Sequence, residues 1–266
     1  MKNNIITILL LITIFVCSLF LGKLIFNIIM SLFAILSLRE MLHIRTKEKP
    51  VPIEVELISY VIILFFVMNN YGNNLAYYLI DYKLLAALSL SSLIPLVIIN
   101  NKKKYNVLDA LYLIGSTLFI GITFNLLTQF RMNNSNYVIY IFIIALISSI
   151  FELITNYYIG KTIIMPTINP KKTLEGIFGG IAMSTIVSSM FFISMIETNL
   201  PIYGIIIISF ILAIIGQFGD LVFSFIKKEF NKSSFYNYNI GNSGILDIMD
   251  SVIFITLGFI LFVTII

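Results

Sequence analysis

The chain has 266 residues, of which 59% are hydrophobic and only 11% are charged, with a mean hydropathy of +1.01 and a net charge of +4. Soluble domains carry about 25% charged residues, so this composition excludes a soluble fold and predicts an all-α, polytopic integral membrane protein. The apolar runs do not alternate with polar residues as those of a β-barrel would. The single cysteine and single histidine exclude a cysteine metal cluster, a histidine-pair metal site and a Ser-His-Asp triad.

We expect about nine transmembrane helices in a single membrane domain, residues 1–266. Residues 1–136 would hold the N-terminal spans, and residues 137–266 the spans that carry a site at the cytoplasmic face. The first apolar run lacks a cleavage pattern and is followed at once by more apolar sequence, so we interpret it as a retained span. The expected spans are 5–21, 24–42, 56–70, 76–99, 107–128, 137–159, 174–195, 202–226 and 246–266.

The basic residues predict how the chain is oriented in the membrane. With a cytoplasmic N-terminus, fourteen of the 17 lysines and arginines fall in cytoplasmic segments, which is the bias that membrane insertion favours. This orientation accounts for most of the positive charge, so no nucleic-acid partner is needed. It predicts a multi-pass protein of the cell membrane, in contact with the lipid bilayer and with its site facing the cytoplasm.

Five carboxylates from four spans fall at a similar depth near that face: Glu152, Glu175, Asp220, Asp247 and Asp250. Each would be costly alone in lipid, but together they suit a hydrated cavity or a bound cation. Asp247 and Asp250 are three residues apart and share a helix face, as do Asp220 and Ser224. Carboxylates are the ligands that Mg²⁺ prefers, so we predict that Asp220, Asp247 and Asp250 hold one or two Mg²⁺ ions.

Lysines near these acids predict a phosphate-binding site. Lys227 and Lys228 follow Asp220 near the end of its span, and Lys171 and Lys172 lie in the segment "INPKKTLEGIFGG". Thr173 is a good N-cap for the span that begins there, and a helix N-terminus beside lysines attracts anions. Glu175 opens the same span. Three glycines in it should allow close approach of another helix or of a ligand: Gly176, Gly179 and Gly180.

Each of these features alone has a simpler explanation. An aspartate at a helix start often only complements the helix dipole, and a lysine pair is often only a topology marker. Glu40 stands beside Arg39 near the end of the second span, where we expect an ion pair at the membrane interface. The common depth of the five carboxylates favours the functional interpretation.

Two segments resemble the phosphatidate cytidylyltransferases, also called CDP-diacylglycerol synthases. "INPKKTLEGIFGG" is similar to that family's Ser-Pro-Lys-Lys-Thr-x-Glu-Gly-x-x-Gly-Gly loop. "GDLVFSFIKKEFNKSSFYNYNIGNSGILDIMDS" resembles its C-terminal signature, in register from Gly219 to Ser251. "LREMLHIR" is similar to its early cytoplasmic loop. The resemblance covers the whole architecture, with specific motifs in about 50 residues.

Several polar positions of the family pattern are substituted. Asn242 and Ser243 replace His-Gly, and Leu153 stands where the family has an aspartate, with Glu152 about 100° away around the helix. The other substitutions are Lys228 and Ile248 for arginine and Ser233–Ser234 for Lys-Asp. The changes leave open a divergent active enzyme or a homologue that has lost catalysis.

The resemblance implies a nucleotidyltransferase that uses CTP and phosphatidate to make CDP-diacylglycerol and pyrophosphate for phospholipid synthesis. By this resemblance the catalytic residues are Asp220, Asp247, Asp250 and Lys227, and a homodimer is possible. The substrate-binding residues are Lys171, Lys172, Thr173, Ser224, Lys228, Glu175 and Asn242. A cation transporter is a third hypothesis, but it predicts acids across the membrane midplane, whereas here they gather at one face.

Overall fold

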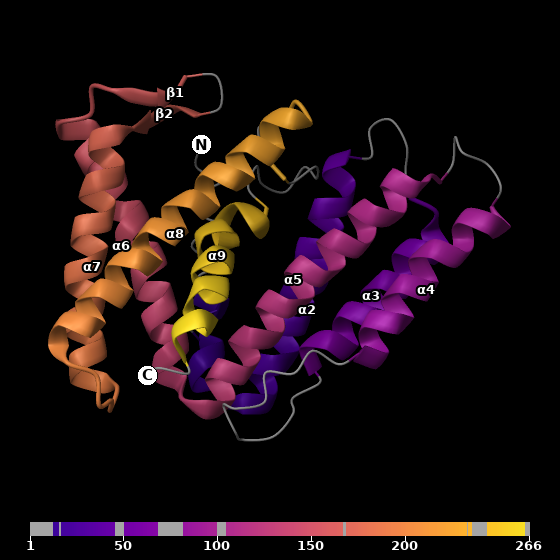
Figure 1. The fold of residues 1–266 in the computed structure, drawn as a ribbon, viewed down its shortest axis with the longest axis horizontal. Helices are drawn as coiled ribbons and strands as arrows, with labels where there is room; N and C mark the ends of the chain where they lie inside the picture. The colour runs from indigo at the N-terminus through magenta and orange to yellow at the C-terminus, as the bar shows by residue number, and fades with distance from the viewer. Residues whose placement is uncertain are drawn as a thin grey trace. The chain divides into compact units, whose positions relative to one another are not determined.

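The computed structural model describes residues 13–15, 17–45, 51–68, 82–99, 105–166, 169–232, 234–235 and 244–263. Within these residues the chain is almost entirely helical, as Figure 1 shows. The helices are α2 (Lys23–Arg45), α3 (Ile53–Met68), α4 (Tyr82–Ile98), α5 (Val107–Asn133), α6 (Ser135–Tyr158), α7 (Leu174–Met195), α8 (Ile202–Glu229) and α9 (Leu246–Val263). Residues 13–15 and 17–20 are helical as well.

Six of the described helices are long and apolar enough to cross a membrane: α2, α5, α6, α7, α8 and α9. This confirms the polytopic helical class. Helices α3 and α4 have 16 and 17 described residues, fewer than the roughly 20 that span a bilayer. The number of nine spans therefore stays a prediction.

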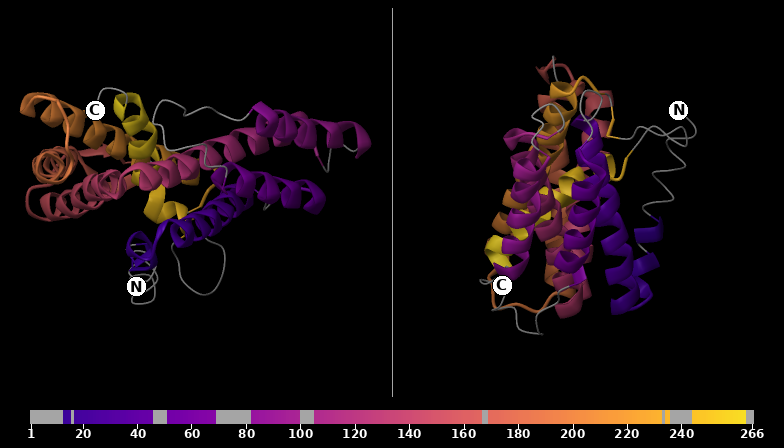
Figure 2. Two further views of the ribbon diagram at one scale, coloured as in Figure 1. Left: turned by 90° about the horizontal axis from the view of Figure 1, so that it is seen from below. Right: turned by 90° about the vertical axis from the view of Figure 1, so that its right-hand side faces the viewer.

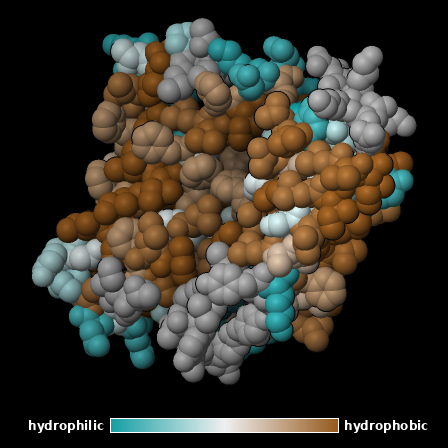
Figure 3. Space-filling model, turned by 45° about the vertical axis from the view of Figure 1, so that its right-hand side comes forward, coloured by the Kyte–Doolittle hydropathy of each residue, from teal (hydrophilic) through white to brown (hydrophobic). Residues whose placement is uncertain are grey.

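Large apolar side chains face outward along these helices, and hydrophobic residues dominate the face shown in Figure 3. Val97 is 81% exposed, Leu153 70% and Met190 66%. Such a surface would drive aggregation in water, but it matches the hydrocarbon core of a bilayer. The helices thus bury one side against each other and offer the other side to lipid.

The described residues belong to two compact units, residues 1–132 with 232–248 and residues 133–231 with 249–266. In the first unit, α5 approaches α3 at Gly121, where an added Cβ would lie 3.4 Å from Phe66. The Asn125 side chain donates to the Phe66 carbonyl over 2.5 Å. The guanidinium of Arg45, at the end of α2, pairs with Asp109 of α5 at 2.5 Å. Figure 2 gives two further views of these helices.

The second unit is built from α6, α7, α8 and most of α9, with a hairpin of β1 (Ile163–Met165) and β2 (Asn169–Thr173) at the ends of α6 and α7 (Figure 1). The strands are antiparallel, with Ile163 opposite Thr173. We did not expect this hairpin. It is compatible with Pro170, because a two-stranded sheet consists only of edge strands and these tolerate proline.

Aromatic side chains and glycines hold the helices of the second unit against one another. The ring of Tyr140 in α6 packs against Phe192 of α7 and Phe259 of α9, with centroids 5.0 and 5.7 Å away. Its hydroxyl lies 2.7 Å from the Ser209 hydroxyl of α8. Helices α8 and α9 meet closely at Gly216 and Gly219 of α8 and at Gly258 of α9. These contacts bring the middle of α8 beside α9.

Candidate catalytic site

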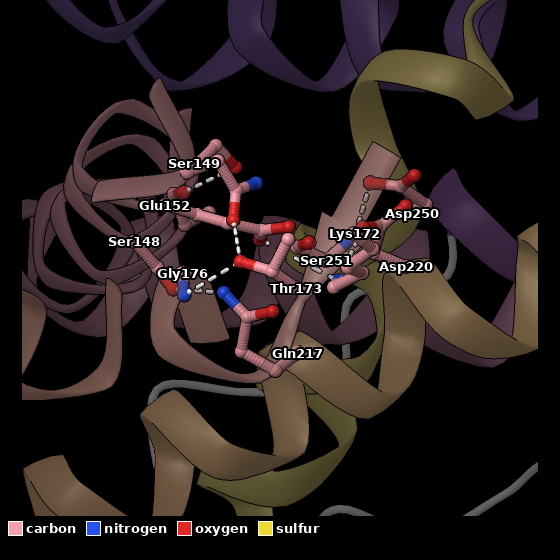
Figure 4. A network of polar contacts seen from close by, with 12 residues as sticks. Ser148, Ser149, Glu152, Lys172, Thr173, Gly176, Gln217, Asp220, Asp250 and Ser251 are labelled. Atoms are coloured by element: carbon pink, nitrogen blue, oxygen red, sulfur yellow. Dashed lines mark hydrogen bonds and ion pairs between the residues drawn. The ribbon is translucent and has the colours of Figure 1, made fainter. Parts of the chain in front are cut away.

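A buried lysine forms the centre of the candidate site. The Lys172 side chain is 1% exposed, and its ammonium lies 2.5 Å from Oδ2 of Asp220 and 3.5 Å from Oε2 of Glu152. Figure 4 shows the three side chains pointing toward one another from β2, α8 and α6. A buried ammonium needs such partners, because an unpaired charge is strongly disfavoured in a medium of low dielectric.

The cap of α7 places Lys172 in this position. Strand β2 ends at Thr173, whose hydroxyl accepts a hydrogen bond from the Gly176 N–H over 3.2 Å. This confirms the predicted N-cap. The same hydroxyl donates to the side-chain oxygen of Asn156 on α6. The residue before the cap is therefore held at the junction of α6 and α7, while the side chain of Lys171 lies outside the described residues.

The predicted glycine contacts are also confirmed. A Cβ at Gly176 would run into the Asn156 side chain, and one at Gly179 would run into Thr155. At Gly180 an added Cβ would lie 2.7 Å from the Ser148 carbonyl oxygen. All of these neighbours belong to α6, so the glycines of α7 set the close approach of the two helices that carry Glu152 and the Thr173 cap.

Glu152 lies in the cluster, although Leu153 is the residue in register with the family's aspartate. Its side chain is 13% exposed and faces Lys172, whereas Leu153 is 70% exposed. The motif register suggested the position of Leu153, but the face of α6 that packs on its neighbours belongs to Glu152. The offset of one residue around the helix is thus no obstacle to its taking part.

Sequence reasoning missed a buried amide beside Glu152. Gln217 of α8 is 5% exposed and donates from Nε2 to the Ser148 hydroxyl of α6 over 2.7 Å (Figure 4). One sequence signal was available, because Gln217 stands three residues before Asp220 and therefore shares its helix face. A buried amide in an apolar span is expected to have such partners.

Asp250 reaches the same region through a second glycine contact. A Cβ at Gly219 would lie 2.9 Å from the Asp250 carbonyl oxygen and 2.8 Å from Cβ of Phe254. Because Gly219 precedes Asp220, the two aspartates stand on neighbouring turns of α8 and α9, and Figure 4 shows both beside Lys172. Oδ1 of Asp250 accepts the Ser251 N–H over 2.6 Å.

Further along α8, the predicted phosphate-binding residues differ in exposure. Ser224 is buried at 8% exposure, Lys227 is half-buried and Lys228 is exposed in the last turn. The Glu175 carboxylate accepts the backbone N–H groups of Lys161 and Thr162 and the Thr162 hydroxyl. Glu175 therefore anchors the entry to the hairpin.

The other predicted aspartate, Asp247, lies in the first turn of α9. Its Oδ2 accepts the backbone N–H of Gly244 over 2.9 Å and that of Phe235 over 3.2 Å. Glu40 of α2 accepts the N–H groups of Ile245 and Leu246, each over 2.9 Å. From the sequence we expected an ion pair between Glu40 and Arg39. We did not expect both Glu40 carboxylate oxygens to accept backbone hydrogen bonds from the start of α9. Asn242 lies outside the described residues.

The donor chemistry fits a magnesium ion. Across the ranges given above, no group of three or more His, Cys, Asp or Glu side chains stands in metal-binding geometry. Mg²⁺ commonly needs only one or two protein carboxylates, with water and substrate phosphate completing its coordination. Asp220 and Asp250 are hard oxygen donors on neighbouring turns of α8 and α9, and Asp220 already has the Lys172 ammonium as its counter-charge.

These features define a polytopic helical membrane protein with a buried cluster of charged side chains, Lys172, Asp220 and Glu152. The sequence model of the Cytidylyltransferase family matches residues 2–266, so the chain belongs to that family. A phosphatidate cytidylyltransferase of Staphylococcus saprophyticus is 27% identical over 96% of both chains. The Staphylococcus aureus protein of that name (strain COL) is 28% identical over 96% of both. That of Staphylococcus haemolyticus is 32% identical over 58% of this chain and 59% of its own.

Proposed function

We propose that this protein is a phosphatidate cytidylyltransferase, which transfers the cytidylyl group of CTP to phosphatidate and releases pyrophosphate. The observation that carries this proposal is the buried Lys172–Asp220 pair. Both residues stand at positions that match the family's two motifs. Family membership and the names of the relatives support the same reaction.

The reaction needs charge neutralisation and alignment more than proton transfer. A phosphate oxygen of phosphatidate attacks the α-phosphorus of CTP, and the bond to the β-phosphate oxygen breaks. A phosphate monoester is already anionic at pH 7, since its second pKa is about 6, so the nucleophile needs no general base. The attack places negative charge on the reacting phosphates, and fixed cations stabilise it.

In this proposal Lys172 neutralises a substrate phosphate from its position at the end of β2. Asp220 and Asp250 hold Mg²⁺, with Asp247 as a further ligand on the same face of α9. When bound, the ion would act as a Lewis acid and stabilise the negative charge on the phosphoryl oxygens. The remaining proposed substrate-binding residues are Lys171, Thr173, Glu175, Ser224, Lys227, Lys228 and Asn242.

The finer topology is part of the proposal: nine spans, a cytoplasmic N-terminus and a site facing the cytoplasm of the cell membrane. The distribution of lysine and arginine supports it. Cys17 is the only cysteine, so labelling in a Cys17→Ser background is a clean test. A cysteine at Lys161 should be shielded from an impermeant maleimide in intact cells, and one at Glu197 should be labelled. Homodimerisation remains a family-level proposal.

The decisive experiment is a turnover assay on purified protein in detergent, with labelled CTP, dioleoyl phosphatidate and Mg²⁺. We expect a lipid-soluble CDP product that chelation of Mg²⁺ abolishes. Asp250→Asn should lower kcat/KM by about a hundredfold or more, because a metal ligand is lost. Glu197→Gln removes an exposed carboxylate outside the cluster and should keep full activity.

A folded wild-type protein that makes no product would overturn the proposed reaction. The substituted positions in the C-terminal signature would then identify a homologue that has lost catalysis. A product that Asp250→Asn leaves unchanged would keep the reaction but remove Asp250 from the site.

A further inference from the structure

Three consecutive backbone N–H groups at the start of α9 are bound by two carboxylates. The Gly244 N–H donates to Asp247, and the N–H groups of Ile245 and Leu246 donate to the two oxygens of Glu40. All three distances are 2.9 Å. Glu40 lies on α2, 206 positions before Leu246, so this contact joins distant parts of the sequence within one unit.

The start of α9 needs an external cap. The first N–H groups of a helix have no intrahelical partner, and a preceding Ser, Thr, Asp or Asn normally accepts from them. Thr173 does so for α7, and Asn134 does so for α6. The residue before α9 is Ile245, which has no acceptor in its side chain. The Glu40 carboxylate takes the place of the missing cap.

Gly244 shows that this contact constrains the sequence. A Cβ at Gly244 would lie 2.5 Å from Oε2 of Glu40 and 2.7 Å from its carboxyl carbon. Gly244, Ile245 and Leu246 are all buried, and Leu246 is fully so. A side chain at Gly244 would force the Glu40 carboxylate to move away from its position against this backbone.

We propose that Glu40 is a positioning residue for the cytidylyl transfer. It fixes the first turn of α9, and this turn and the next carry Asp247 and Asp250. Asp247 depends on the same segment, because its carboxylate accepts the Gly244 N–H. The inference rests on the proposed function. It adds a residue from the N-terminal half of the chain that touches neither substrate nor metal.

Two substitutions separate this role from general support of the fold. Glu40→Gln keeps the size of the side chain but replaces one accepting oxygen with an NH₂ group, which cannot accept. Glu40→Asp keeps the charge but shortens the reach by one methylene. Glu54→Gln is the matched control, since Glu54 is exposed in the first turn of α3.

Hydrogen exchange should be measured on the full-length protein in detergent, together with kcat in the CTP assay. In Glu40→Gln we expect exchange of the 244–250 segment to rise by about tenfold or more, since a hydrogen bond to a charged group is lost. We expect kcat to fall by about tenfold to a hundredfold, because small misplacements of catalytic groups are this costly. Glu40→Asp should recover part of both effects, and Glu54→Gln should change neither.

Unchanged exchange at 244–250 in Glu40→Gln would overturn the proposed contact, and faster exchange with unchanged kcat would overturn the positioning role. A rise in exchange along the whole of α2, with Glu40→Asp no better than Glu40→Gln, would also overturn it in favour of general support. If the wild-type protein has no turnover, the proposed function fails, while local exchange still reports whether Glu40 holds the segment.

Discussion

The ammonium of Lys172 lies 2.5 Å from Oδ2 of Asp220, although 48 positions separate the two residues in the chain. Lys172 is almost fully buried, and the Asp220 side chain is 30% exposed. The ammonium of the pair therefore lies in the protein interior, whereas part of the Asp220 side chain is accessible from outside. Glu152 lies 3.5 Å from the same ammonium, so the buried charge of Lys172 has a second carboxylate partner.

The Lys172–Asp220 pair should be energetically coupled. Unfolding free energies of Lys172→Met, Asp220→Asn and the double variant should give a coupling energy of about 0.5–3 kcal/mol, as expected for residues in direct contact. Lys172→Met should be the more destabilising single change, because it leaves two neighbouring carboxyl groups without their cation. Denaturant titration in detergent measures all three values.

The control for that cycle is Lys161→Met, which removes an exposed lysine near the same hairpin. Its effect should stay within about 0.5 kcal/mol. Single effects at Lys172 and Asp220 that add to within about 0.3 kcal/mol would contradict the coupling.

The hydroxyl of Thr173 should be required for the cap of α7. Thr173→Val keeps the shape but loses the acceptor for the Gly176 N–H and the donor to Asn156. We expect a loss of about 1–2 kcal/mol, seen as a lower apparent Tm in detergent. Thr173→Ser keeps the hydroxyl and should lie close to wild type. An equal loss in both variants would assign the effect to the methyl group.

The contact between α6 and α7 should not tolerate a side chain at Gly176. In Gly176→Ala the new methyl group would collide with Asn156, and we expect destabilisation of about 1–3 kcal/mol from overpacking. Gly115→Ala is the matched control, because an added Cβ there meets nothing within 4 Å. It should stabilise α5 slightly, since alanine favours the helix. Thermal unfolding in detergent compares the two.

The close approach at Gly219 should be needed for catalysis. In Gly219→Ala the methyl group would press on the Asp250 carbonyl and on Phe254, which moves α9 relative to Asp220. We expect kcat to fall by up to about a hundredfold, with a smaller loss of stability. Gly204→Ala, near the start of α8, has its nearest neighbour at 3.7 Å and should keep wild-type kcat. Full activity in Gly219→Ala would show that the two aspartates need not be held together.

The sequence by itself determined the features that depend on local composition and on neighbours along the chain. Apolar runs predicted membrane helices because lipid requires them, and the six long helices agree. Thr173 was predicted as a cap because capping involves only the next three residues. Gly176, Gly179 and Gly180 predicted a close helix contact because three small residues leave the backbone accessible.

Only the tertiary structure decided which distant groups meet. The motif register pointed to Leu153, but the packed face of α6 carries Glu152. The rotation of a helix about its axis depends on the helices it packs against, so the sequence of that helix alone does not determine it. Sequence proximity suggested Arg39 as the partner of Glu40, whereas the carboxylate caps a helix that begins at residue 246. Lys172 meets Asp220 because the hairpin and the glycine contacts bring β2, α6 and α8 together. The distance between two helices depends on all of their contacts together, so it cannot be predicted from a single sequence motif.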